Sequence, residues 1–195
     1  DKIHFSGKDQ IIAQARFLRA YYYFELIKWF GDVPLAVDQR LLFGDQFNVD
    51  RTPRAEVYAQ IEQDLIFAAE TLPATQAEEG RITSGAARAL LGKAYLYQDK
   101  FTEAANALDQ VVAGPYDLVD DYSTIFELEG ENNIESVFEV QYTDKEGAGF
   151  GCLQCSEGNV AVGFNGIRNY SGPLFDSGFS FNVPVQEAYD AFAPG

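Results

Sequence analysis

Apolar residues recur at helical spacing in four segments of the chain. In the first segment they form two stripes, because steps of three and four residues place side chains on one face of a helix. The stripes are Ile11, Ala15, Leu18, Tyr22, Leu26 and Trp29 on one face, with Phe17, Tyr21 and Phe24 beside them. Two stripes predict two packed neighbours. Trp29 and the run Tyr21–Tyr23 are therefore interpreted as packing residues.

The second helical segment has clear boundaries in the sequence. Thr52 is predicted as the N-cap, with Pro53 in the first helical position, and Pro73 closes the helix. Gly31 ends the preceding helix and Pro34 prevents its resumption. The apolar face of the second helix consists of Val57, Ile61, Leu65, Ala68 and Leu72.

Two further helices are predicted as a hairpin joined by a short turn at Asp99 and Lys100. Their stripes are Ala87, Leu90, Leu91, Ala94 and Tyr95, followed by Phe101, Ala104, Ala105, Leu108 and Val112. Leu91-Gly92, Tyr95, Ala104 and Leu108 fall at tetratricopeptide spacing, which puts small residues where helices approach and large ones in the groove. An unrelated antiparallel helix pair is the alternative.

The rest of the chain changes character. Alternating Phe138, Val140 and Tyr142 predict a strand over 135–142, glycines crowd residues 147–184, and residues 185–192 predict the start of another helix. We therefore expect a mainly α fold: tetratricopeptide-like helical hairpins over residues 1–146 and a loop-rich, minor-β remainder over 147–195, within one domain.

Composition excludes several partners. The formal charge of -16 repels nucleic acid and anionic lipid, and it favours an uncharged ligand. No stretch reaches the roughly 18 consecutive apolar residues of a membrane-spanning helix. His4 is the only histidine, which argues against histidine-based triads and two-histidine zinc sites. The GAGFG run at 147–151 lacks the third glycine of a dinucleotide loop, so no nucleotide cofactor is expected. Together with the single histidine, this leaves no cofactor and no metal as the expectation.

Cys152 and Cys155 form a CxxC pair with three interpretations: a redox dithiol, half of a zinc site, or a short disulfide. An extracellular setting favours the disulfide. Residues 101–144 carry eleven carboxylates and no Lys or Arg. A calcium site is conceivable, but EF-hand spacing is absent, and a solvated acidic face is favoured.

Several motifs together resemble the SusD-like, or RagB/SusD, nutrient-binding proteins of the Bacteroidetes outer membrane. They are AQARFLRAYYYFELIKWFGDVPL at 13–35, ITSGAARALLGKAYLYQDKFTEAANALDQVV at 82–112, YDLVDDYSTIF at 116–126, IESVFEVQY at 134–142 and NVPVQEAYDAF at 182–192. The resemblance implies tetratricopeptide-like repeats that face a SusC-like TonB-dependent transporter. It also implies a lipid anchor outside this chain, a position on the extracellular face of the outer membrane, glycan capture without catalysis, and a longer polypeptide.

Glycan capture calls for flat aromatic faces and side chains that pair with hydroxyls. The glycine-rich segment 163–175 offers Phe164, Asn165, Arg168, Asn169 and Tyr170, which we predict as ligand contacts. The alternative is that its aromatic residues anchor the loop to the core.

Two other functions remain open. A tetratricopeptide scaffold binding a peptide or protein would use Tyr95 and its repeat neighbours. A hydrolase would need two carboxylates, for instance among Asp120, Asp121 and Glu127, with a raised pKa on one.

Overall fold

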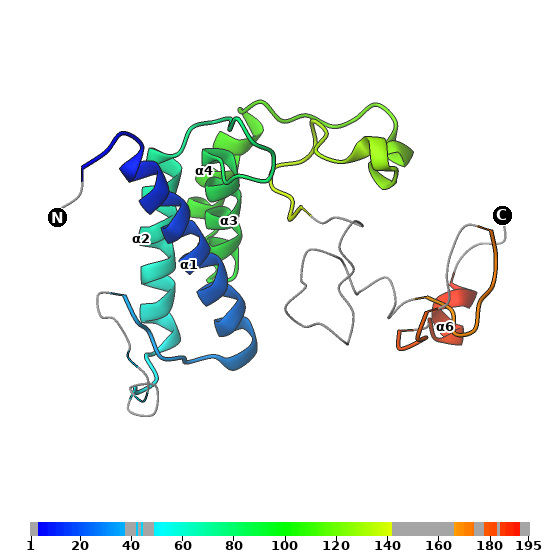
Figure 1. Cartoon of the computed structure of the whole chain (residues 1–195). Coiled ribbons are helices and arrows are strands. Elements are labelled where there is room, and N and C mark those ends of the chain that lie inside the picture. The colour runs from blue at the N-terminus through cyan, green and yellow to red at the C-terminus, as the bar shows by residue number, and fades with distance from the viewer. Residues whose placement is uncertain are drawn as a thin grey trace. The chain divides into compact units, whose positions relative to one another are not determined.

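The computed structural model describes residues 4–37, 42, 44, 49–141, 166–173, 178–182 and 184–191. They belong to two compact units, Asp1–Glu139 and Val140–Gly195. The predicted boundary at 146/147 lies outside the described residues and stays a prediction. The first unit holds α1 (Lys8–Phe30), α2 (Arg54–Thr71), α3 (Ser84–Leu96), α4 (Phe101–Val112) and the 3₁₀ turns η2 (Tyr122–Phe126) and η3 (Leu128–Gly130); the second holds α6 (Gln186–Asp190) (Figure 1). The mainly α class is confirmed.

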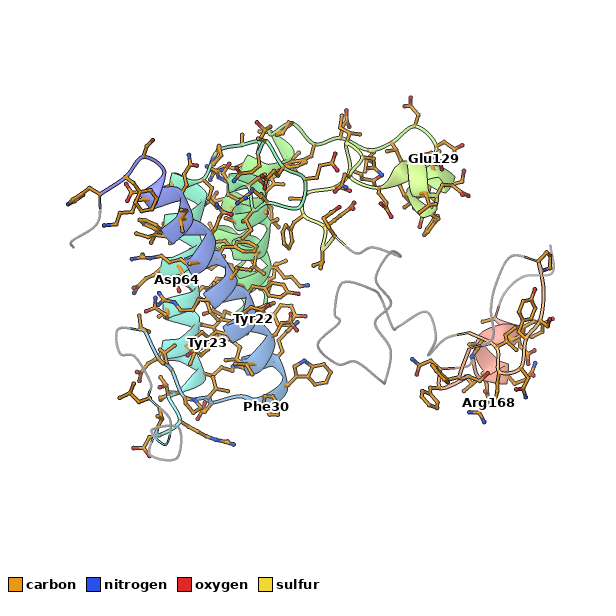
Figure 2. The ribbon with its side chains drawn as sticks, viewed as in Figure 1. Tyr22, Tyr23, Phe30, Asp64, Glu129 and Arg168 are labelled. Atoms are coloured by element: carbon orange, nitrogen blue, oxygen red, sulfur yellow. The ribbon has the colours of Figure 1, made fainter. Side chains whose placement is uncertain are left out.

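The two apolar stripes of α1 have different surroundings. The buried face of the helix packs against α2 and α3, and it consists of Ala13, Phe17, Ala20, Phe24 and Ile27. On the opposite face Leu18 is 42% exposed and Tyr22 is 62% exposed. Figure 2 labels Tyr22 on α1. The prediction that both stripes pack is therefore wrong for the described residues. Periodicity could not rank the stripes, because both have helical spacing.

Helix α2 buries its whole predicted face. Its start differs from the prediction by one residue: Pro53 occupies the N-cap position, and no side chain caps the helix. The backbone N–H of Thr52 instead donates to the Val33 carbonyl at 2.9 Å, which ties the segment after α1 to the start of α2. Tyr23 strengthens the same connection, since its hydroxyl accepts a hydrogen bond from the Ala36 N–H at 2.8 Å. Tyr23 is thus a packing residue, as predicted.

Helices α3 and α4 form the expected hairpin. Thr83 caps α3 by accepting a hydrogen bond from the Ala86 N–H, and Asp99 makes the turn with φ of 59°. Gly92 lies so close to α4 that a Cβ there would stand 2.6 Å from the Leu108 side chain. The two end residues of the apolar stripe predicted on α4 do not pack: Phe101 is 63% exposed and Val112 is 79% exposed.

The predicted strand does not form. Residues 135–141 of the described chain are irregular, and only isolated bridges occur among the residues that the structure describes. Phe138 still serves the core, because its ring meets Phe17 edge-to-face at 5.5 Å. Alternation of apolar residues reports one covered face, but a strand also needs a partner for its backbone hydrogen bonds.

Asp64 joins α2 to α1 through a buried ion pair. The carboxylate is 1% exposed and receives two hydrogen bonds of 2.7 Å from the Arg19 guanidinium. Gln60 adds a third at 3.1 Å, and Arg19 also donates to the Val37 carbonyl. A buried carboxylate is tolerated only when it is paired and hydrogen-bonded, so this geometry selects one register of the two helices.

Arg19→Met should lower the free energy of unfolding by about 3 kcal/mol, because the buried Asp64 carboxylate loses its counter-charge. Arg81→Met removes an exposed pair with Glu78 and should cost less than about 1 kcal/mol. Urea unfolding followed by circular dichroism measures both. Equal losses would show that the Arg19 pair contributes no more than a surface contact.

Gly92→Val should destabilise the hairpin by about 1–3 kcal/mol, because the new side chain overlaps Leu108. Leu108→Ala should then cost less in the Gly92→Val background than in the unmodified protein. Thermal unfolding of the four proteins of this double-mutant cycle measures the coupling. Additive losses would contradict the close approach of α3 and α4 at this point.

Candidate functional site

The predicted ligand loop is held by backbone contacts within the second unit. The N–H of Gly178 donates to the Ile167 carbonyl at 3.0 Å, and the N–H of Ser180 donates to the Gly166 carbonyl at 2.9 Å. A Cβ on Gly178 would stand 2.3 Å from Gly166 backbone atoms. Gly178 is therefore needed where the two segments approach.

The three described candidate residues of this loop have different environments. The Arg168 guanidinium folds back and donates to the Phe179 carbonyl at 2.7 and 3.2 Å. Asn169 is exposed and has φ of 60°, and Tyr170 is half-buried. Arg168 therefore holds the loop, and Asn169 is an exposed residue on it. Phe164 and Asn165 lie outside the described residues.

The cysteine pair and the acidic stretch were the other candidates. Cys152 and Cys155 lie outside the described residues. Within the described chain, no three metal-binding side chains gather. Asp121 instead caps η2, accepting hydrogen bonds from the Ser123 hydroxyl at 2.7 Å and its N–H at 2.9 Å. These bonds lower the pKa of Asp121, whereas a glycosidase acid needs a raised pKa.

In the first unit, α1 ends, α2 begins and α3 ends at the same end of the helices (Figure 1). The residues there line a hollow of about 480 Å³. It is lined by Ile27, Lys28, Trp29, Arg54, Tyr58 and Tyr97. Trp29 is 79% exposed and Tyr97 is 51% exposed. The prediction that Trp29 is a packing residue is therefore wrong for the described chain.

Sequence reasoning missed this hollow because its residues are far apart in the chain. Arg54 and Tyr97 reach Trp29 only after three helices have packed. One signal was present: apolar residues lie on two opposite faces of α1, and two apolar faces need more packed neighbours than one. That pattern predicts exposed apolar side chains on α1, although not their partners.

Arg168→Ala should loosen the loop, since two hydrogen bonds to the Phe179 carbonyl are lost. We expect amide hydrogen exchange of Gly178 and Ser180 to accelerate about fivefold, for roughly 1 kcal/mol of lost hydrogen bonding. Asn169→Gly is the matched control, because glycine keeps the positive φ without strain. Equal acceleration in both variants would show that the hydrogen bonds from Arg168 to the Phe179 carbonyl do not hold the loop.

Comparison with known proteins identifies close relatives. Residues 2–96 match a SusD-like family model described as "Starch-binding associating with outer membrane". SusD-like protein P2 of Formosa agariphila is 28% identical over 186 residues, which cover 92% of this chain and 35% of that protein. Three curated relatives share the SusD-like name, and this chain spans 27% to 35% of their length.

The solved structures that resemble this chain include a SusD-like protein and a surface glycan-binding protein. A "Laminarin binding SusD-like protein" is 37% identical with a TM-score of 0.82, over 94% of this chain and 44% of that chain. Surface glycan-binding protein A from Bacteroides fluxus is 26% identical with a TM-score of 0.82, over 99% of this chain and 42% of that chain. In the described part of this chain, no helix has the length and hydropathy needed to cross a bilayer.

Proposed function

Since this chain belongs to the SusD-like family, we propose that it forms part of a non-catalytic protein that captures a glycan at the outer membrane. The observation that carries the proposal is the likeness, over 94% of this chain, to a protein described as laminarin-binding. The ligand is an uncharged oligosaccharide or polysaccharide, because the charge of -16 disfavours polyanions.

In this proposal, capture is reversible and needs no covalent chemistry. A sugar ring stacks on an aromatic face while amide and guanidinium groups pair with its hydroxyls. Phe164, Asn165, Arg168, Asn169 and Tyr170 supply such groups. What supports the assignment is the exposed Asn169 beside Tyr170 on a loop whose backbone is fixed by close glycine contacts. A preformed loop loses less entropy on binding than a mobile one.

The captured glycan is then handed to a SusC-like TonB-dependent transporter. The protein is held on the extracellular face of the outer membrane by a lipid anchor outside this chain. Both parts of the proposal come from the family, whose model is described as associating with the outer membrane.

Isothermal titration calorimetry against a panel that includes laminarin and starch oligosaccharides tests the function. We expect one glycan of the panel to bind. Tyr170→Ala should then weaken its affinity about tenfold, as loss of roughly 1.4 kcal/mol of ring contact requires. Asn169→Gly should weaken it less, since it removes one amide and keeps the backbone.

Tyr122→Ala is the control, because Tyr122 is an exposed tyrosine on η2 in the other unit. If no glycan of the panel binds, the proposed function fails. If a glycan binds and neither Tyr170→Ala nor Asn169→Gly changes its affinity, the function stands and the loop is not the site.

A further inference from the structure

The hollow at the shared end of α1, α2 and α3 combines two exposed aromatic rings with hydrogen-bonding groups. Trp29 and Tyr97 stand on its rim with more than half of each residue exposed. Its volume of about 480 Å³ falls within the roughly 300–1,000 Å³ of small-molecule sites. An exposed tryptophan beside a hollow of this size gives a flat surface on which a ring can stack.

Tyr58 forms part of the lining and supplies a free hydroxyl. The residue is only 4% exposed, and no described residue hydrogen-bonds its oxygen. No fully buried side-chain oxygen or nitrogen lacks a partner among the described residues, so the Tyr58 oxygen is not sealed from solvent, and Tyr58 lines the hollow. Burial raises the pKa of Tyr58, with Arg54 opposing, so the hydroxyl keeps its proton and remains a donor at neutral pH.

Two cations line the same space. The Arg54 guanidinium stands 5.6 Å from the centre of the Tyr58 ring, and no described carboxylate pairs with it. Lys28 pairs with Glu25 at 2.6 Å, and the Asp32 carboxylate accepts a hydrogen bond from the backbone N–H of Arg54 at 2.8 Å. These carboxylates offset the positive charge. The hollow therefore offers hydrogen-bond donors to the hydroxyl groups of a ligand without attracting anions strongly.

We propose that this hollow is a second carbohydrate-binding site, which takes a pyranose ring of an uncharged glycan against Trp29 and Tyr97. Tyr58 and Arg54 donate to its hydroxyls from the floor and the rim. The inference rests on the proposed glycan capture and adds a contact on the helical unit. A sugar suits the lining better than an apolar peptide does, because Tyr58 and Arg54 would lose their hydrogen bonds to water beneath an apolar side chain.

Trp29 is the only tryptophan of the chain, so intrinsic tryptophan fluorescence reports on this hollow alone. Laminarin oligosaccharides are the first probe, followed by any glycan that binds in calorimetry. We expect a saturable change in Trp29 emission. Tyr58→Phe should raise the midpoint of the titration about fivefold, since one hydrogen bond is lost. Tyr97→Ala should raise it about tenfold, because a stacking ring is lost.

Tyr22→Ala is the matched control, because Tyr22 is 62% exposed on the same helix and lies outside the hollow. It should leave the midpoint unchanged. A glycan that binds in calorimetry without changing Trp29 emission would overturn this inference and leave the proposed function intact. A change in emission that survives both Tyr58→Phe and Tyr97→Ala would overturn it too. Absence of binding by every glycan would overturn both proposals.

Discussion

The register of α1 against α2 depends on the pairing of Arg19 with the buried Asp64 carboxylate (Figure 2). Apolar packing alone tolerates several offsets between two helices, because the apolar side chains on both surfaces can interdigitate in more than one way. A bidentate pair does not, since a shift of one helical turn, about 5.4 Å, would strand the carboxylate in the core.

That register determines what happens at the ends of the helices. With α1 fixed, the chain turns at Gly31, pairs Val33 with Thr52, and starts α2 directly beside the end of α1. Arg54 and Tyr58 then lie near Trp29, and the end of α3 brings Tyr97 to the same place. The hollow thus depends on the helix register, whereas the described segments 166–173 and 178–182 are held together by the close approach of Gly178 to Gly166.

The sequence predicts the helices well and their surroundings less well. Helix α4 begins and ends where its pattern does, and every apolar residue predicted on the face of α2 is buried. For α1, two stripes of equal period left the buried face undetermined. The alternation at Phe138 and Val140 indicated a strand, but the described residues provide no partner strand. Spacing along the chain reports which side chains share a face, and it contains no information on what covers that face.

In the described segments 166–173 and 178–182, contacts that hold the backbone come from Gly178 and Arg168. The close contact of Gly178 with the Gly166 backbone and the hydrogen bonds of the Arg168 guanidinium hold the backbone, while Asn169 is exposed. Position 169 needs only a residue that accepts a positive φ, and aspartate or glycine satisfies that requirement. If this loop binds the glycan as proposed, its preference among sugars can change by substitution at position 169 while the backbone that presents that residue stays the same.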